Sequence, residues 1–124
     1  MNQLSPLTLA FIGDSVFELM VREALVREAN RPANDLHVEK VKFVNAAAQA
    51  EAFRLIENDL TDEELEIYKR GRNAHTTHTP KNMSPADYHS ATGFEALFGF
   101  LYLEDRKDRL NELFNKIWDT GKGV

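Results

Sequence analysis

The chain has 124 residues, no cysteine and a formal charge of −5, and its hydrophobic content of 43% is typical of an ordered globular protein. This length suits one compact domain, and the lack of cysteine excludes disulfides, thiol nucleophiles and thiolate metal sites. Because the net charge is negative, the chain as a whole is not basic, which argues against a nucleic-acid partner unless the average hides a local basic patch.

Apolar residues with helical spacing, interrupted by prolines and small polar clusters, predict about five helices. The first is expected from about Pro6 to Asn30, because Ser5 is a suitable N-cap and proline is favoured at the first helical position. A loop over 30–34 separates it from a second helix, expected from near Asp35 to near Asn58. The periodic apolar positions are Leu9, Ile12, Val16 and Leu19 in the first segment and Val41, Val44, Ala48 and Leu55 in the second.

A capping-box pattern marks the start of the third helix. Thr61 is followed three residues later by Glu64, which is the spacing that lets the two residues cap each other's backbone. This helix is expected to end near Gly71. The polar stretch 72–84 then predicts a loop.

The fourth helix is expected from about Asp87 to Glu104, after a cap at Ser84-Pro85. It is apolar nearly all round, which is typical of a helix at the centre of a bundle. A fifth helix ends near Gly121 and has one apolar stripe, made by Leu110, Leu113, Phe114, Ile117 and Trp118. No hairpin or alternating strand pattern is present, so we predict an all-α fold.

No targeting or membrane-spanning segment is evident in the sequence. The N-terminus lacks the basic region and apolar core of a signal peptide. The longest strongly apolar stretch, 93–103, contains an acid and is far shorter than the roughly 20 residues that span a bilayer. We therefore expect a soluble intracellular protein with no membrane partner.

Two carboxylates stand inside otherwise apolar helical segments: Asp14 within 9–17 and Glu95 within 93–98. Burying an unpaired carboxylate is costly, so each side chain needs a partner. One solution is that both converge on a hard cation such as Mg²⁺, which prefers oxygen ligands and could activate water at a phosphodiester. The other is that each pairs with Lys or Arg, or points to solvent.

One segment is basic although the whole chain is acidic. Residues 67–86 contain no Asp or Glu and carry a formal charge of +4, which leaves −9 for the remainder. A helix end that runs into a polar, cationic loop suits contact with phosphates, and a solvated surface loop is the alternative. The candidate phosphate-contacting side chains, which would bind RNA if the partner is an RNA, are Lys69, Arg70, Arg72, Asn73, Lys81 and Asn82.

His75 and His78 form an H-x-x-H pair within the same segment. A zinc site would need further ligands, and the chain offers no cysteine and no nearby acid. We therefore interpret the pair as surface histidines.

Three motifs, in order along the chain, resemble those of one enzyme family. Residues 9–19 resemble the signature helix of the ribonuclease III family, and residues 90–103 resemble its second acidic helix. Between them, residues 69–74 and 79–82 resemble the loop of the Mini-III subgroup, whose members are catalytic domains without a double-stranded-RNA-binding domain. The resemblance covers nearly the whole chain.

The resemblance implies a ribonuclease III-like helical bundle over residues 1–124 that works as a homodimer. It implies Mg²⁺-dependent cleavage of double-stranded RNA, with Mn²⁺ as a substitute, and it points to precursor 23S ribosomal RNA as the substrate. A ribosomal protein is a candidate helper, and the expected location is the cytoplasm of a bacterium, with a plastid homologue as the alternative. By motif match, Asp14 and Glu95 take the places of metal-binding catalytic acids.

The sequence also departs from the pattern of the larger family members. Ala10 and Leu7 stand where those members carry Glu, and Thr92 stands where they carry Asp. The acidic site is therefore sparser, and the number of metal ions does not carry over. The changes at Ala10 and Thr92 are typical of the Mini-III subgroup, so an active enzyme is still expected.

Two alternatives come from other classes of protein. One is a non-catalytic RNA-binding or ribosome-assembly module with the same fold, which the missing acids make plausible. The other is a helical protein-interaction domain in which Asp14 and Glu95 are buried ion-pair partners. Cleavage of duplex RNA with and without Mg²⁺ separates the first from a nuclease, and stabilisation by divalent metal separates the second.

Overall fold

The computed structural model describes residues 4–74 and 79–121, and all its regular structure is helical. The order is α1 (Pro6–Glu28), α2 (Ala33–Val44), α3 (Ala46–Ile56), the short 3₁₀ helix η1 (Glu57–Asp59), α4 (Asp62–Arg72), α5 (Pro85–Leu103) and α6 (Lys107–Gly121). The predicted all-α class is therefore confirmed. Within the described residues, no helix combines the length and apolar character needed to cross a membrane.

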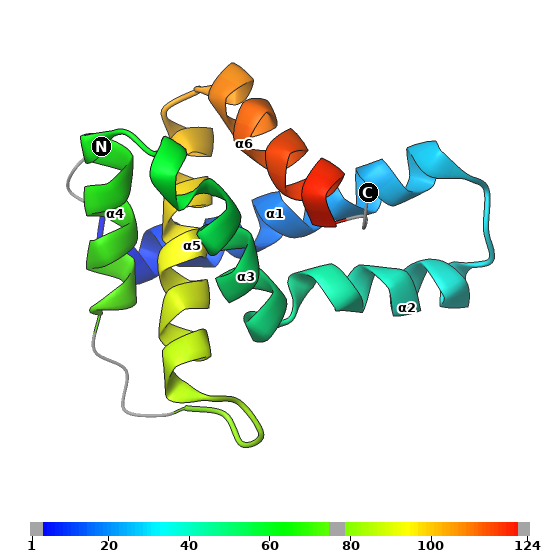
Figure 1. Cartoon of the computed structure of the whole chain (residues 1–124), viewed down its shortest axis with the longest axis horizontal. Helices are drawn as coiled ribbons and strands as arrows, with labels where there is room; N and C mark the ends of the chain where they lie inside the picture. The colour runs from blue at the N-terminus through cyan, green and yellow to red at the C-terminus, as the bar shows by residue number, and fades with distance from the viewer. Residues whose placement is uncertain (1–3, 75–78, 122–124) are drawn as a thin grey trace.

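Helix α5 occupies the centre of the molecule, as its apolar sequence predicts. It runs between α4 and α3, while α1 crosses on its far side (Figure 1). Phe94 and Phe98 of α5 are completely buried, and the ring of Phe17 from α1 meets them edge-on at centroid distances of 4.9 and 5.5 Å. This aromatic cluster joins α1 to α5 and forms the middle of the core.

Two glycines set the distance between α1 and α5. A side chain at Gly13 would overlap the backbone of Glu95, and a side chain at Gly99 would overlap the backbone carbonyl of Leu9. Each helix therefore presents a glycine where the backbone of the other passes. The two helices pack in closer contact than any larger residue at these positions would allow.

The predicted helix caps are confirmed where the structure describes them. The Ser5 hydroxyl accepts a hydrogen bond from the backbone N–H of Thr8 at 3.1 Å, and the Ser84 hydroxyl caps α5 in the same way. Thr61 and Glu64 form the complete capping box at the start of α4. These ends are set by local sequence, because each cap satisfies backbone donors that the helix itself leaves unpaired.

The predicted second helix is in fact two helices. Asn45 has an extended backbone, with φ −73° and ψ 162°, and separates α2 from α3. Its side chain accepts a hydrogen bond from the backbone N–H of Ala48 and donates one to the carbonyl of Val41. Asn45 therefore caps both helices and lets the chain change direction, so that α3 packs on α5 (Figure 1).

Two expectations about helix faces are corrected as a result. Val41 is 41% exposed, so the predicted common apolar face through Val41, Val44, Ala48 and Leu55 does not exist. Leu19 is 65% exposed, and α1 instead buries the stripe that contains Leu9, Gly13 and Phe17. The helical period is right in both segments, but periodicity alone does not identify the inward face when exposed apolar residues are present.

Gly99→Ala should destabilise the fold strongly. Its methyl group would overlap the Leu9 carbonyl, and moving α1 away would unpack Phe17 from α5, so we expect a loss of about 3 kcal/mol in the free energy of unfolding. Urea denaturation followed by circular dichroism measures this loss.

Gly121→Ala is the matched control, because a side chain there would meet the Phe43 ring at an ordinary contact distance of 3.9 Å. If Gly99→Ala proved as mild as the control, the helices would not be held at the distance described above.

Candidate functional site

The crossing of α1 and α5 brings Asp14 and Glu95 together. Asp14 directly follows Gly13, and the backbone of Glu95 passes against that glycine. The two carboxyl groups lie within hydrogen-bonding reach of each other. Neither forms an ion pair with a described Lys or Arg. The structure therefore does not support the alternative in which the two acids are buried ion-pair partners.

This pair is electrostatically unfavourable without a cation. Burial raises the pKa of Glu95, and the neighbouring Asp14 raises it further, to about 8 from an ordinary value of 4.5, although Gln49 opposes the rise. A divalent cation would replace the proton that Glu95 otherwise retains. Asp14 is exposed and Glu95 is half-buried, which leaves space for the waters that Mg²⁺ keeps. The two oxygen donors fit such an ion.

The described residues place no third Asp, Glu or His with this pair. Ala10 is buried against the core, Leu7 lies at the surface, and the hydroxyl of Thr92 donates to the Tyr88 carbonyl at 3.0 Å. None of these three side chains is a carboxylate, so none of them adds an acidic metal ligand to the pair. Among the described residues, this crossing therefore brings together two acids and no third one.

Glu18 lies one turn after Asp14, but its carboxylate is already occupied by cations. It accepts a hydrogen bond from Arg22 at 2.8 Å, and the ammonium group of Lys40 lies 3.5 Å away. Burial works to raise the pKa of Glu18, yet the hydrogen bond from Arg22 and the charge of Lys40 outweigh it and lower the pKa. Glu18 therefore remains ionised and paired beside Asp14.

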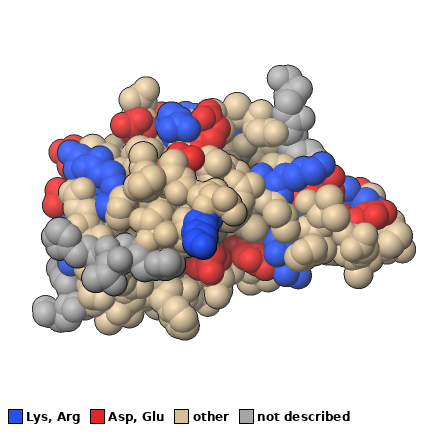
Figure 2. Space-filling view, turned by 90° about the horizontal axis from the view of Figure 1, so that it is seen from below, with Lys and Arg blue, Asp and Glu red and all other residues tan. Residues whose placement is uncertain are grey.

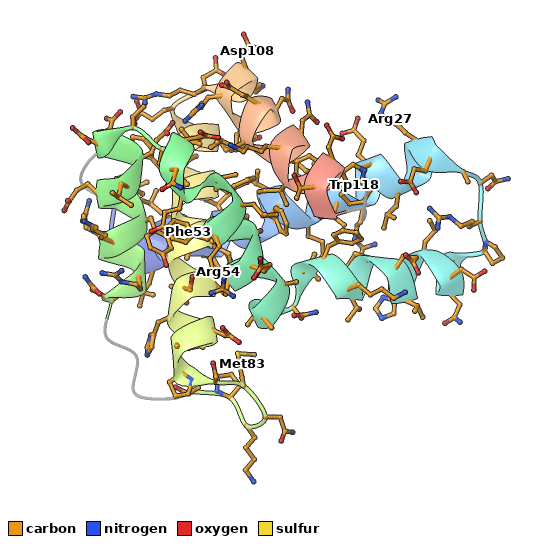
Figure 3. All side chains as sticks on the ribbon, viewed as in Figure 1. Arg27, Phe53, Arg54, Met83, Asp108 and Trp118 are labelled. Atoms are coloured by element: carbon orange, nitrogen blue, oxygen red, sulfur yellow. The ribbon has the colours of Figure 1, made fainter. Side chains whose placement is uncertain are left out.

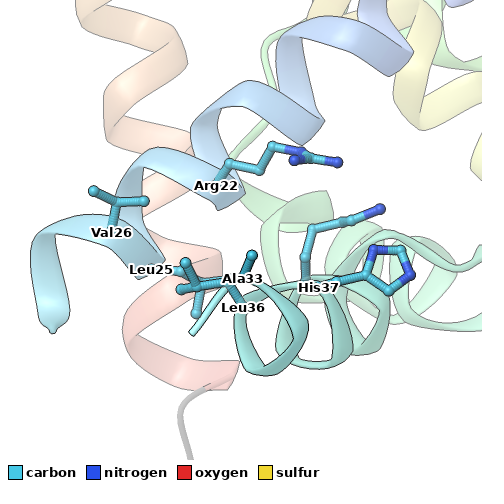
Figure 4. A pocket seen from close by; sticks show the side chains of 7 residues that line it. Arg22, Leu25, Val26, Ala33, Leu36 and His37 are labelled. Carbon is cyan, nitrogen blue, oxygen red and sulfur yellow. The ribbon is translucent and has the colours of Figure 1, made fainter. Parts of the chain in front are cut away.

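Two surface hollows meet at Arg22. One is lined by Asp14, Ser15, Glu18, Leu19 and Arg22, so it opens onto Asp14 from the side of α1. The other lies between α1 and α2, where Arg22 and His37 face it from opposite sides (Figure 4). This second hollow contains neither Asp14 nor Glu95, so the candidate chemistry belongs to the first.

The six predicted RNA-contacting side chains are all exposed. Three of them, Lys69, Arg70 and Arg72, lie in the last turn of α4, and Asn73 is its C-cap. The other two, Lys81 and Asn82, lie in the connection before α5, where Asn82 has a positive φ of 66°.

Four of these side chains differ from every other described cation. Lys69, Arg70, Arg72 and Lys81 form no ion pair with a described acid, whereas each of the other described Lys and Arg residues does. On the face shown in Figure 2, Lys and Arg accordingly lie beside Asp and Glu in several places. Residues 67–86 are therefore basic in sequence, and their described Lys and Arg side chains also lack an acidic partner in the structure.

The basic end of α4 is anchored to the same turn of α5 that carries Glu95. The Tyr68 ring stacks on Phe53 with a centroid distance of 3.6 Å, and its hydroxyl is 2.9 Å from Ser90 on α5 (Figure 3). A side chain at Gly71 would lie 2.8 Å from the Cβ of Ala96, so α4 packs closely on the turn next to Glu95. The cationic end of α4 and the acidic pair therefore lie close together on the molecule.

One motif of the sequence analysis, the H-x-x-H pair of His75 and His78, lies outside the described residues. One buried polar residue near the two acids, Gln49, is not among the predicted site residues. Gln49 is 2% exposed, and its Nε2 has no hydrogen-bond partner among the described residues although the side chain faces Glu95. The sequence contains a signal for Gln49, because it shares a helical stripe with three buried apolar residues, Ala52, Phe53 and Ile56.

The stability of the metal-free protein should fall as the pH rises from about 5 to about 8. The pKa of Glu95 is about 8 in the folded protein and 4.5 ordinarily, so the folded state binds a proton that the unfolded chain releases across this range. Glu95→Gln should remove this part of the pH dependence. Chemical denaturation in EDTA at a series of pH values measures it.

Glu66→Gln, at an exposed position on α4, is the control and should keep the wild-type slope. Equal slopes for Glu95→Gln and the wild type would mean that Glu95 does not hold a proton in the folded protein over this range.

Comparison with known proteins identifies the family to which the chain belongs. The ribonuclease III domain family matches residues 7–106 of the chain. A Mini-ribonuclease 3 from Thermoanaerobacter sp. (strain X514) is 49% identical over 89% of this chain and 78% of its own length, and one from Staphylococcus aureus is 44% identical over 92% and 87%. A crystal structure from Fusobacterium nucleatum superposes with a TM-score of 0.87, at 29% identity over 96% of this chain and 95% of that one. The chain therefore belongs to the ribonuclease III family of ribonucleases, within its Mini-III subgroup.

Proposed function

We propose that this ribonuclease is a divalent-metal-dependent endonuclease for double-stranded RNA, with Asp14 and Glu95 as its metal-binding catalytic acids. The observation that carries the proposal is the meeting of these two carboxyl groups from α1 and α5, within hydrogen-bonding reach and without a cation from the described chain. Mg²⁺ is the expected ion because both donors are hard oxygens, and Mn²⁺ accepts the same ligands.

The chain's own contribution is a rigid, accessible pair of carboxylates. The close glycine packing between α1 and α5 holds both acids on packed helices, so their separation does not depend on a mobile loop. Arg22 and Lys40 keep Glu18 occupied, so that Glu18 does not compete for the ion. When bound to both acids, a divalent cation would supply Lewis-acid activation of the scissile phosphate and of the attacking water.

The basic end of α4 is the proposed contact for the RNA backbone. Lys69, Arg70, Arg72 and Lys81 are exposed and free of described acids, so they can meet phosphates without breaking an ion pair. Asn73 and Asn82 add neutral hydrogen-bonding groups beside them. Duplex RNA is read mainly by its shape and through phosphate and 2′-hydroxyl contacts, which suits a surface of this kind.

A homodimer is proposed from the apolar face of α1. Phe11 is 83% exposed and is joined on this face by Leu7, Leu19 and Tyr102, which are all partly exposed. The same face carries an open groove lined largely by apolar residues: Ile12, Val16, Leu19, Met20, Tyr102 and Leu110. A second copy seated here would cover the exposed face by two-fold symmetry and would present two acidic pairs, one for each strand of a duplex.

The proposed biological substrate is the precursor of 23S ribosomal RNA, in the bacterial cytoplasm, with a ribosomal protein as a candidate helper. Membership of the Mini-III subgroup supports this assignment. With no RNA-binding domain within the 124 residues, RNA binding falls to the catalytic surface, so the affinity for RNA should be modest and strongly dependent on salt.

Asp14→Asn should reduce Mg²⁺-dependent cleavage of duplex RNA by at least about a hundredfold, because the substitution removes one of two metal-binding carboxylates. Gel analysis of a labelled duplex measures cleavage, while circular dichroism and light scattering check that the helical fold and the dimer are retained.

Cleavage by this variant at the wild-type rate would rule out the assigned site. A wild-type protein that binds the duplex but never cuts it in Mg²⁺ would instead favour the non-catalytic RNA-binding module.

Replacing Arg70 and Arg72 together by Ala should weaken binding to duplex RNA. It should also lower the slope of log affinity against log salt by about one for each phosphate that the protein no longer neutralises. Fluorescence anisotropy at several salt concentrations, in Ca²⁺ to prevent cleavage, measures both effects.

The double variant Arg27→Ala with Arg54→Ala is the matched control. It removes the same charge from two exposed arginines that pair with acids on their own helices (Figure 3). If both double variants changed the salt slope equally, the end of α4 would have no special role in binding RNA.

A further inference from the structure

Gln49 is a buried polar residue on an otherwise apolar surface of α3. Its stripe of Ala52, Phe53 and Ile56 packs into the core, and Gln49 itself is 2% exposed. Its Nε2 has no hydrogen-bond partner among the described residues. An unpaired buried donor is unfavourable, and an apolar residue of the same size would avoid that cost.

The group that Gln49 faces is the carboxyl of Glu95. The Gln49 side chain acts on Glu95 in the sense that favours the charged carboxylate, opposite to the effect of Asp14. A carboxylate is an acceptor with several lone pairs, and the Gln49 amide is a donor. The unpaired donor of Gln49 thus lies beside a carboxyl group that can accept a hydrogen bond.

We propose that Gln49 is a positioning residue for the metal site: its amide N–H donates to the Glu95 carboxylate and fixes the orientation in which Glu95 meets the ion. The proposal rests on the proposed function, because it assumes that Glu95 binds a divalent metal. Gln49 does not act as a ligand, since its enclosed position leaves no path for the water that the ion retains.

This role explains how a sparse site can hold a metal. The described residues contain no third acid at the site. With only two carboxylates, the orientation of each becomes more important. Groups that orient metal ligands in this way commonly change metal affinity by about 10- to 100-fold when they are removed.

The test compares Gln49→Met with the wild type in binding Mn²⁺. Methionine is unbranched and of similar length, so it fills the same space without the amide. Electron paramagnetic resonance of free Mn²⁺ measures the dissociation constant, and thermal unfolding measures the melting temperature with and without Mn²⁺. Ile56→Val, on the same stripe of α3, controls for altered packing, and Asp14→Asn controls for loss of the site.

We expect Gln49→Met to keep or raise the metal-free melting temperature, because an unpaired buried donor is removed. Its Mn²⁺ dissociation constant should rise by about tenfold or more, and its cleavage rate should recover when the metal concentration is raised. Ile56→Val should bind Mn²⁺ as the wild type does. If Gln49→Met fails to fold, Gln49→Leu takes its place.

Unchanged Mn²⁺ affinity in the Gln49 variant, beside clear loss in Asp14→Asn, would overturn the role of Gln49 and leave the proposed function standing. Equal Mn²⁺ responses in the wild type and Asp14→Asn would overturn the metal site and the role of Gln49 together.

Discussion

The contact between α1 and α5 is the constraint on which the site depends. Gly13 and Gly99 each lie where the backbone of the other helix passes, so the helices can meet only if both positions lack a side chain. Asp14 follows the first glycine, and Glu95 lies one turn before the second. The packing that closes the core around Phe17 therefore also brings the two carboxyl groups together. Packing and chemistry cannot be changed independently here, because any widening of the crossing separates the acids.

The described Lys and Arg residues are mostly paired with acids, and the exceptions lie at the end of α4 and in the connection before α5. Ten described cations form ion pairs, while Lys69, Arg70, Arg72 and Lys81 do not. Asp14 and Glu95 are likewise without a cationic partner and face each other instead. The net charge of −5 is a poor guide to the partner for this reason. The charges that a phosphate backbone or a divalent cation would meet are the ones that the fold leaves uncompensated.

Much of this fold is predictable from the sequence where the cause is local. The caps at Ser5, Thr61 and Ser84 follow from short-range hydrogen bonds, and the central place of α5 follows from its apolar surface. The break at Asn45 escapes prediction because asparagine is tolerated inside a helix, and its capping role depends on where α3 must pack. The prediction of one unbroken helix also fails to place Gln49 in the core, because the inward face of one long helix differs from the inward face of the separate α3. The meeting of Asp14 with Glu95 is only a hypothesis from residue type and resemblance, because residues 81 positions apart meet only through tertiary packing.

The account's central claim is that Asp14 and Glu95 bind one divalent cation at the crossing of α1 and α5. Anomalous X-ray diffraction from crystals grown with Mn²⁺ tests this claim most directly, because it locates the ion without reference to activity. We expect a single strong anomalous peak in contact with a carboxylate oxygen of each residue. A Mn²⁺ peak bound elsewhere, or none at this crossing at saturating Mn²⁺, would contradict the claim.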